Sequence, residues 1–124
     1  MIIWIYKGFY KRYRDAKLKV GESDDGKTLR LRLKYFYEYL VKQKDDSPLY
    51  LFEGAVENNR DARDLINGYK VPKYFQEDLF EVLGDNNRPP YRWFLIGPKR
   101  SGTTVHIDPL MTSAWNISLQ GRKL

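Results

Sequence analysis

The sequence feature that most constrains the fold is a run of alternating side chains, Thr103 to Asp108. Successive side chains of a strand point to opposite faces, so His106 and Asp108, two positions apart, are expected to leave the same face. An imidazole beside a carboxylate is commonly a hydrogen-bonded structural pair, and it can also supply two of the three ligands of a non-haem Fe(II) site. With one histidine and no cysteine in the chain, a zinc site of the usual Cys/His spacing is excluded.

The periodicity of the remaining sequence predicts a mixture of helices and strands. Three leucines that alternate with basic residues, Leu29, Leu31 and Leu33, are typical of a half-buried strand. The stretch Ser23 to Gly26 has the composition of a hairpin turn. We expect helices over 6–17, 35–44, 61–66 and 74–83, strands over 18–20, 29–33, 49–52, 91–96, 103–108 and 113–119, and a turn over 109–112.

Charge divides the chain into two parts. Residues 1–44 hold 12 basic and 5 acidic residues, whereas residues 45–124 hold 10 basic and 11 acidic ones. We therefore expect a basic N-terminal helical and hairpin region over 1–44 and a second part over 45–124. Aromatic rings among the N-terminal basic residues could stack on nucleic-acid bases while the cations contact phosphates. Alternatively, the basic side chains form the solvent-exposed face of a helix whose aromatic rings pack inward, and we favour this interpretation.

Size and composition favour a folded, intracellular protein. At 124 residues, with 42% hydrophobic side chains, the chain is large enough for a core. Its apolar start, residues 1–6, is much shorter than a membrane span, and basic residues follow it instead of preceding it as in a signal peptide. The absence of cysteine fits a reducing compartment.

Four stretches resemble one known enzyme family, and the resemblance extends in order from about Lys11 to Lys123. They are Asp45 to Phe52, Tyr69 to Phe75, Arg88 to Phe94 and Gly97 to Asn116. Together they resemble the JmjC-domain 2-oxoglutarate oxygenases, and in particular the bifunctional arginine demethylase and lysyl-hydroxylase subfamily, first called phosphatidylserine receptor. The resemblance implies an α+β chain in which a mixed N-terminal region leads into the first strands of a double-stranded β-helix, a cupin-like jelly roll. On this interpretation the chain is a truncated N-terminal fragment.

The resemblance also implies a set of site residues. His106 and Asp108 take the positions of the first two iron ligands, and the distal histidine of the family has no counterpart in this sequence. Four residues match the positions that bind the co-substrate 2-oxoglutarate: Tyr50, Thr103, Asn116 and Lys123. Taken alone, Tyr50, Thr103 and Asn116 would be ordinary polar residues of a strand.

The implied activity is Fe(II)- and 2-oxoglutarate-dependent hydroxylation of protein side chains with O2, chiefly of lysine, with arginine demethylation as a second reaction. The implied substrates are arginine- and serine-rich or histone-like proteins of the nucleus, and the implied location is the nucleus, with the cytoplasm as a further possibility. The competing hypothesis is an inactive chain that binds RNA or protein through its basic N-terminal third.

Overall fold

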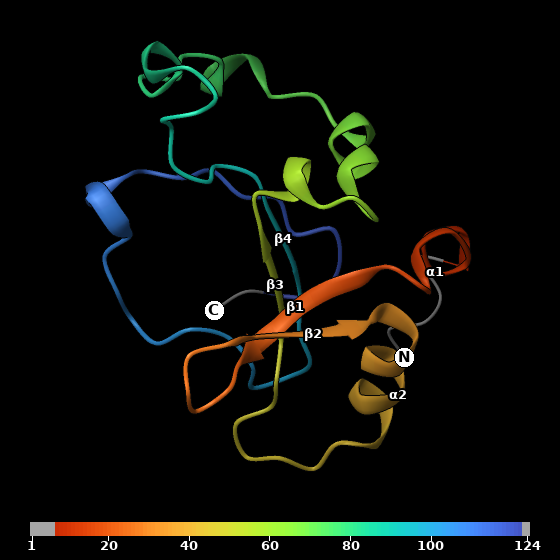
Figure 1. Ribbon diagram of the computed structural model, residues 1–124. Coiled ribbons are helices and arrows are strands. Elements are labelled where there is room, and N and C mark those ends of the chain that lie inside the picture. Colours follow the sequence, from red (N-terminus) through yellow and green to blue (C-terminus); the bar gives the residue numbers. More distant parts are fainter. Residues whose placement is uncertain (1–6, 123–124) are drawn as a thin grey trace.

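The computed structural model describes residues 7–122, and these form a mixed α+β arrangement (Figure 1). Helix α1 (Lys7–Tyr13) leads into a hairpin of strands β1 (Lys17–Glu22) and β2 (Thr28–Arg32), and helix α2 (Leu33–Lys42) follows at once. Strands β3 (Leu51–Gly54) and β4 (Trp93–Ile96) form a second antiparallel pair. The other elements are short 3-10 helices: η1 (Val56–Asn58), η2 (Arg63–Gly68), η3 (Lys73–Phe75), η4 (Glu81–Leu83) and η5 (Pro109–Met111).

The first hairpin forms where the turn residues predict it. The Gly26 amide donates to the Ser23 carbonyl at 2.8 Å, and the Ser23 amide donates to the Lys27 carbonyl at 2.8 Å. Gly26 has φ +77°, a left-handed conformation that glycine adopts without steric cost. The predicted strands and turn are therefore confirmed, with Leu18 paired to Leu31 in the antiparallel register.

The two predicted helices at the start of the chain are confirmed with different bounds, and α2 begins and ends two residues earlier than the predicted 35–44. Helix α1 begins at Lys7, the first residue described, and ends at Tyr13, four residues before the expected end. Helix α2 has a hydrophobic stripe, which places Leu33 and Phe36 in the core with no exposed surface. Tyr6, the first residue of the predicted helix, lies outside the described residues.

One hydrophobic core holds these elements together. It is formed by Tyr13, Ala16, Leu18, Val20, Leu33, Phe36, Leu51 and Ala62. The members come from both sides of the charge boundary at residue 44. Burial of such side chains from water is the main stabilising term, roughly 1.5–3 kcal/mol for each large aliphatic or aromatic one.

The two strand pairs are separate sheets that meet along β1 and β3. In Figure 1 the β1–β2 ribbon crosses the β3–β4 pair. In the second pair, Leu51 is opposite Ile96 and Gly54 is opposite Trp93. The Trp93 ring covers the Gly54 backbone so closely that a Cβ at Gly54 would lie 2.6 Å from it.

The predicted helix over 74–83 is wrong. The structure has only η3 and η4 there, and the apolar side chains that would form the buried stripe are exposed, Leu79 by 87% and Val82 by 86%. An amphipathic stripe stabilises a helix only when the whole stripe packs against a surface. Here Phe75 stacks on Trp115, while Leu79 and Val82 stay exposed. The helix predicted over 61–66 is present as the 3-10 helix η2.

The strands predicted over 103–108 and 113–119 are also not formed. Strands require a hydrogen-bonded neighbour, and within the described part of the chain no other extended segment pairs with them. The turn predicted over 109–112 is present as η5. Strand β4 begins two residues later than predicted and has alternating half-burial instead of burial on both faces. The described residues thus form a mixed α+β arrangement with two small sheets, and a jelly roll is not observed.

No helix among residues 7–122 is sufficiently long and apolar to cross a lipid bilayer.

Candidate metal centre

His106 and Asp108 point toward each other although their segment is not a strand. The distance from Nε2 of His106 to Oδ1 of Asp108 is 3.0 Å. The backbone bends at Val105 and is extended at Asp108, and the two side chains, two residues apart, leave the same side of the chain. The predicted pairing therefore depends only on local backbone conformation, which explains why it is present without a sheet.

The second nitrogen of the imidazole also faces an oxygen. Nδ1 of His106 lies 2.7 Å from the carbonyl oxygen of Thr104. Both partners of the ring are acceptors, and neutral imidazole has a single N–H. When Nδ1–H donates to the Thr104 carbonyl, Nε2 presents its lone pair to the Asp108 carboxylate, so a cation between the two satisfies both groups.

The donor pair is suited to a divalent first-row metal. Imidazole and carboxylate are the two ligand types of the facial triad that holds Fe(II). Adjacent donors about 2.1 Å from an octahedral ion are about 3.0 Å apart, and this matches the distance from Nε2 to Oδ1. Both side chains are partly exposed, which leaves room for further ligands.

The pair does not complete a metal site by itself. Among residues 7–122 there is no cluster of three or more histidine, cysteine, aspartate or glutamate side chains arranged to hold a metal ion. After Asp108 the backbone turns sharply through Leu110 and Met111, whose φ angles are 59° and 55°. Left-handed conformations of this kind are uncommon for residues other than glycine and often occur at functional sites.

The residues expected to bind a co-substrate are only partly assembled. Tyr50 directly precedes β3 and lies beside Gly97, where an added Cβ would be 3.2 Å from the Tyr50 Cβ. Thr103 and Asn116 are exposed. Lys123 lies outside the described residues. Tyr50 therefore lies beside Gly97, where the segment that leads to His106 begins, and the side chains of Thr103 and Asn116 are accessible to solvent.

An aromatic cluster anchors the segment that carries Asn116. The Trp115 ring stacks on Phe75, with centroids 5.7 Å apart and planes within 6°. Tyr69 approaches the same indole edge-on at 6.1 Å. Each such ring pair contributes roughly 0.5–1.5 kcal/mol beyond its buried area. Through these contacts the neighbour of Asn116 is attached to η2 and η3.

Sequence reasoning missed a buried carboxylate, Glu53. It is 3% exposed and accepts hydrogen bonds from Arg30 at 2.7 and 3.2 Å and from the Lys19 amide at 2.9 Å. A signal was present, because Glu53 is two residues from the apolar Leu51 and therefore shares its buried face. A carboxylate on a buried face requires a cationic partner.

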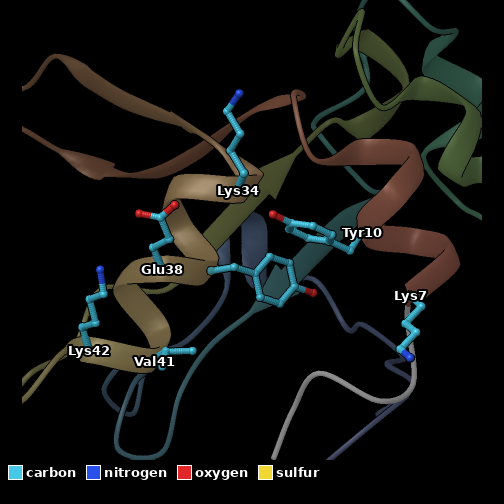
Figure 2. A pocket seen from close by; sticks show the side chains of 7 residues that line it. Lys7, Tyr10, Lys34, Glu38, Val41 and Lys42 are labelled. Atoms are coloured by element: carbon cyan, nitrogen blue, oxygen red, sulfur yellow. The ribbon is translucent and has the colours of Figure 1, made fainter.

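A groove lies between α1 and α2 in the basic region (Figure 2). Its volume is about 290 Å³, and it is lined by Lys7, Tyr10, Lys34, Tyr37, Glu38, Val41 and Lys42. The Tyr10 and Tyr37 rings meet edge-to-face at 5.2 Å. Lys34 donates to Asp15 at 2.7 Å, and this hydrogen bond holds the pKa of the Asp15 carboxyl below its usual value.

Comparison with known proteins identifies the relatives of this chain. No protein-family model matches it. The bifunctional arginine demethylase and lysyl-hydroxylase of Caenorhabditis elegans is 48% identical over 120 residues, which are 97% of this chain and 30% of that protein. The lysine-specific demethylase JMJ21 of Arabidopsis thaliana is 38% identical over 120 residues, 97% of this chain and 12% of the relative.

By sequence, this chain is a homologue of the JmjC-type demethylases and hydroxylases. The expected family resemblance is therefore confirmed. A further JmjC relative, named a 2-oxoglutarate and iron-dependent oxygenase in Drosophila melanogaster, is 41% identical over 58 residues, 46% of this chain and 14% of that protein. The chain spans about a third of the nematode relative and less of the other two.

Proposed function

We propose that the protein containing these residues is an Fe(II)- and 2-oxoglutarate-dependent protein hydroxylase of the JmjC type. The observation that carries the proposal is the 3.0 Å approach of His106 to Asp108 in a chain whose relatives are named as demethylases, hydroxylases and iron-dependent oxygenases. Lysine hydroxylation is the principal reaction, and arginine demethylation is the second.

His106 and Asp108 have the role of metal ligands. Hydrogen bonding from Nδ1 to the Thr104 carbonyl fixes the ring orientation and leaves the Nε2 lone pair for the metal. The sequence contains one histidine, so the second histidine of a facial triad has to come from outside these 124 residues. Two ligands alone form a weak chelate, and this chain by itself is expected to be inactive.

Tyr50, Thr103, Asn116 and Lys123 have the role of co-substrate ligands. The hydroxyl groups of Tyr50 and Thr103 and the amide of Asn116 can donate to carboxylate oxygens of 2-oxoglutarate. The Lys123 ammonium provides the countercharge by charge-assisted hydrogen bonds. Of these positions, Tyr50 directly precedes β3, lies beside Gly97 and has its ring 5.8 Å from that of Phe52.

Bound iron and 2-oxoglutarate would supply the oxidising chemistry: 2-oxoglutarate loses CO2 and becomes succinate, which gains one atom of O2, and the other atom is inserted into a C–H bond of the substrate. A lysine methylene group gains a hydroxyl, whereas a hydroxylated N-methyl group on arginine leaves as formaldehyde. The proposed substrates are basic proteins, arginine- and serine-rich or histone-like, and the proposed location is the nucleus.

The test uses the protein at the length found in its source. It is incubated with Fe(II), 2-oxoglutarate and a basic peptide containing lysine and methylated arginine, and succinate and the mass of the peptide are measured. Succinate formation that increases with the peptide, together with a gain of one oxygen atom, is the expected result. His106→Ala and Asp108→Ala should abolish both signals, while Asp24→Ala, in the exposed hairpin turn, should change neither.

A second candidate function is favoured by the groove between α1 and α2. Three lysines surround two tyrosine rings there, a combination that fits an anionic polymer whose bases or side chains stack on the rings. Here the chain acts as an RNA- or protein-binding module without oxygenase activity. Salt-dependent RNA binding that Lys7→Ala and Lys42→Ala weaken, in a protein that forms no succinate, would support this function over the first.

A further inference from the structure

The carboxylate of Glu53 lies at the contact between the two sheets. Strands β1 and β3 pack against each other without a shared ladder, since each belongs to its own two-stranded sheet. In a continuous sheet the backbone amide of Lys19 would donate a hydrogen bond to a carbonyl of the next strand. Here it donates instead to Oε2 of Glu53, at 2.9 Å. The β1–β2 register also shifts between Lys19 and Gly21. A side chain therefore replaces the missing backbone hydrogen bonds.

Arg30 completes this bridge from β2. Its two terminal nitrogens donate to the two oxygens of Glu53, Nη1 at 2.7 Å and Nη2 at 3.2 Å. A bidentate pair of this kind fixes orientation as well as distance. Because Glu53 is 3% exposed and the Arg30 side chain 44% exposed, the carboxylate is desolvated and cannot exchange its protein partners for water. The bridge holds β3 in one position relative to the first hairpin.

The opposite face of β3 carries the candidate co-substrate ligand. Leu51 and Glu53 point into the core, and by alternation Tyr50 and Phe52 point to the other side. Phe52 lies 4.7 Å from Trp93 and 5.8 Å from Tyr50 between ring centroids. Any rotation of β3 about its axis moves Glu53 and Tyr50 in opposite directions.

We infer that the Arg30–Glu53 bridge is a positioning device that orients Tyr50 for 2-oxoglutarate. The inference rests on the proposed function. Apolar residues of similar volume often replace a buried ion pair with no loss of stability, so stability alone does not require a charged bridge here. An apolar pair has no directional hydrogen bonds, so it cannot fix the orientation of β3 relative to the first hairpin.

The test compares Arg30→Met/Glu53→Leu with the unchanged protein, at the length found in its source. We expect the temperature of unfolding to be nearly unchanged and KM for 2-oxoglutarate to rise about tenfold, with a smaller effect on kcat. The control is Arg12→Met/Asp64→Leu, which removes another ion pair between elements, the one that joins α1 to η2. This control should leave KM for 2-oxoglutarate unchanged.

Each outcome decides between the claims. An unchanged KM in the folded double variant overturns the positioning role and leaves the oxygenase function intact. If the unchanged protein forms no succinate, the proposed function fails and the positioning role fails with it. Should the double variant not fold, Arg30→Lys is used instead, because it keeps the charge but cannot form both hydrogen bonds to Glu53. A raised KM for 2-oxoglutarate in Arg30→Lys supports the positioning role, and an unchanged KM overturns it.

Discussion

Glu53 is nearly fully buried while its ion-pair partner Arg30 remains 44% exposed at the side chain. The two members of the pair therefore differ in what happens when the other is removed. Without Glu53, the Arg30 guanidinium can turn to water. Without Arg30, the Glu53 carboxylate stays desolvated, with the Lys19 amide as its remaining recorded donor.

This asymmetry predicts different losses of stability for the two single variants. Arg30→Met should lower the free energy of unfolding by about 3 kcal/mol, because it leaves a buried charge without its counterion. Glu53→Leu should lower it by about 1–2 kcal/mol, since the remaining cation is solvated. Urea unfolding of both variants measures the difference, and a larger loss for Glu53→Leu would contradict the described burial.

Phe36 is the largest side chain in the core with no exposed surface. Phe36→Ala should remove about 3–5 kcal/mol from the free energy of unfolding, through lost burial and the cavity that remains. Val41→Ala, on the exposed side of the same helix, should change it by less than about 0.5 kcal/mol. Equal losses in urea unfolding would show that α2 does not pack through the face described.

The link between α1 and η2 predicts a dependence of stability on pH. The hydroxyl of Tyr13 and the guanidinium of Arg12 donate to Asp64, and they hold the pKa of its carboxyl below the usual value. A group with a lowered folded-state pKa stabilises the fold above its unfolded pKa, near 3.9 for aspartate. This stabilisation is lost as the pH falls through the folded-state pKa.

We expect Asp64→Asn to reduce the acid-side loss of stability. Urea midpoints at about pH 5 and about pH 2.5 measure the loss, which should be larger in the unchanged protein than in Asp64→Asn. The exposed Asp24→Asn is the matched control and should behave like the unchanged protein. Identical losses in all three proteins would show that Asp64 does not contribute to acid unfolding.

The parts of the fold that the sequence predicts are those governed by local structure. Turn residues and alternation determine the first hairpin, and the apolar spacing that starts at Tyr35 predicts α2, although Leu33, expected in the strand, is the first residue of the helix. The pairing of His106 with Asp108 is also local, because side chains two residues apart can meet without a distant partner.

The failures occur where a segment depends on distant surfaces. In residues 74–83 the apolar side chains of Leu79 and Val82 are exposed, and residues 103–108 have strand alternation but no paired strand among residues 7–122. Glu53 shows the same limit for the candidate site. Its burial follows from alternation with Leu51, but the choice of Arg30 as its partner depends on how two sheets pack.

The central claim is that His106 and Asp108 bind a divalent metal together. The most direct measurement is Mn(II) binding to the protein at the length found in its source, followed by electron paramagnetic resonance of the free ion. The account predicts that His106→Ala and Asp108→Ala each weaken binding by at least about 100-fold, while Asp24→Ala binds as the unchanged protein does. Equal affinity in all four proteins would contradict it, and His106 and Asp108 would then be a structural hydrogen-bonded pair.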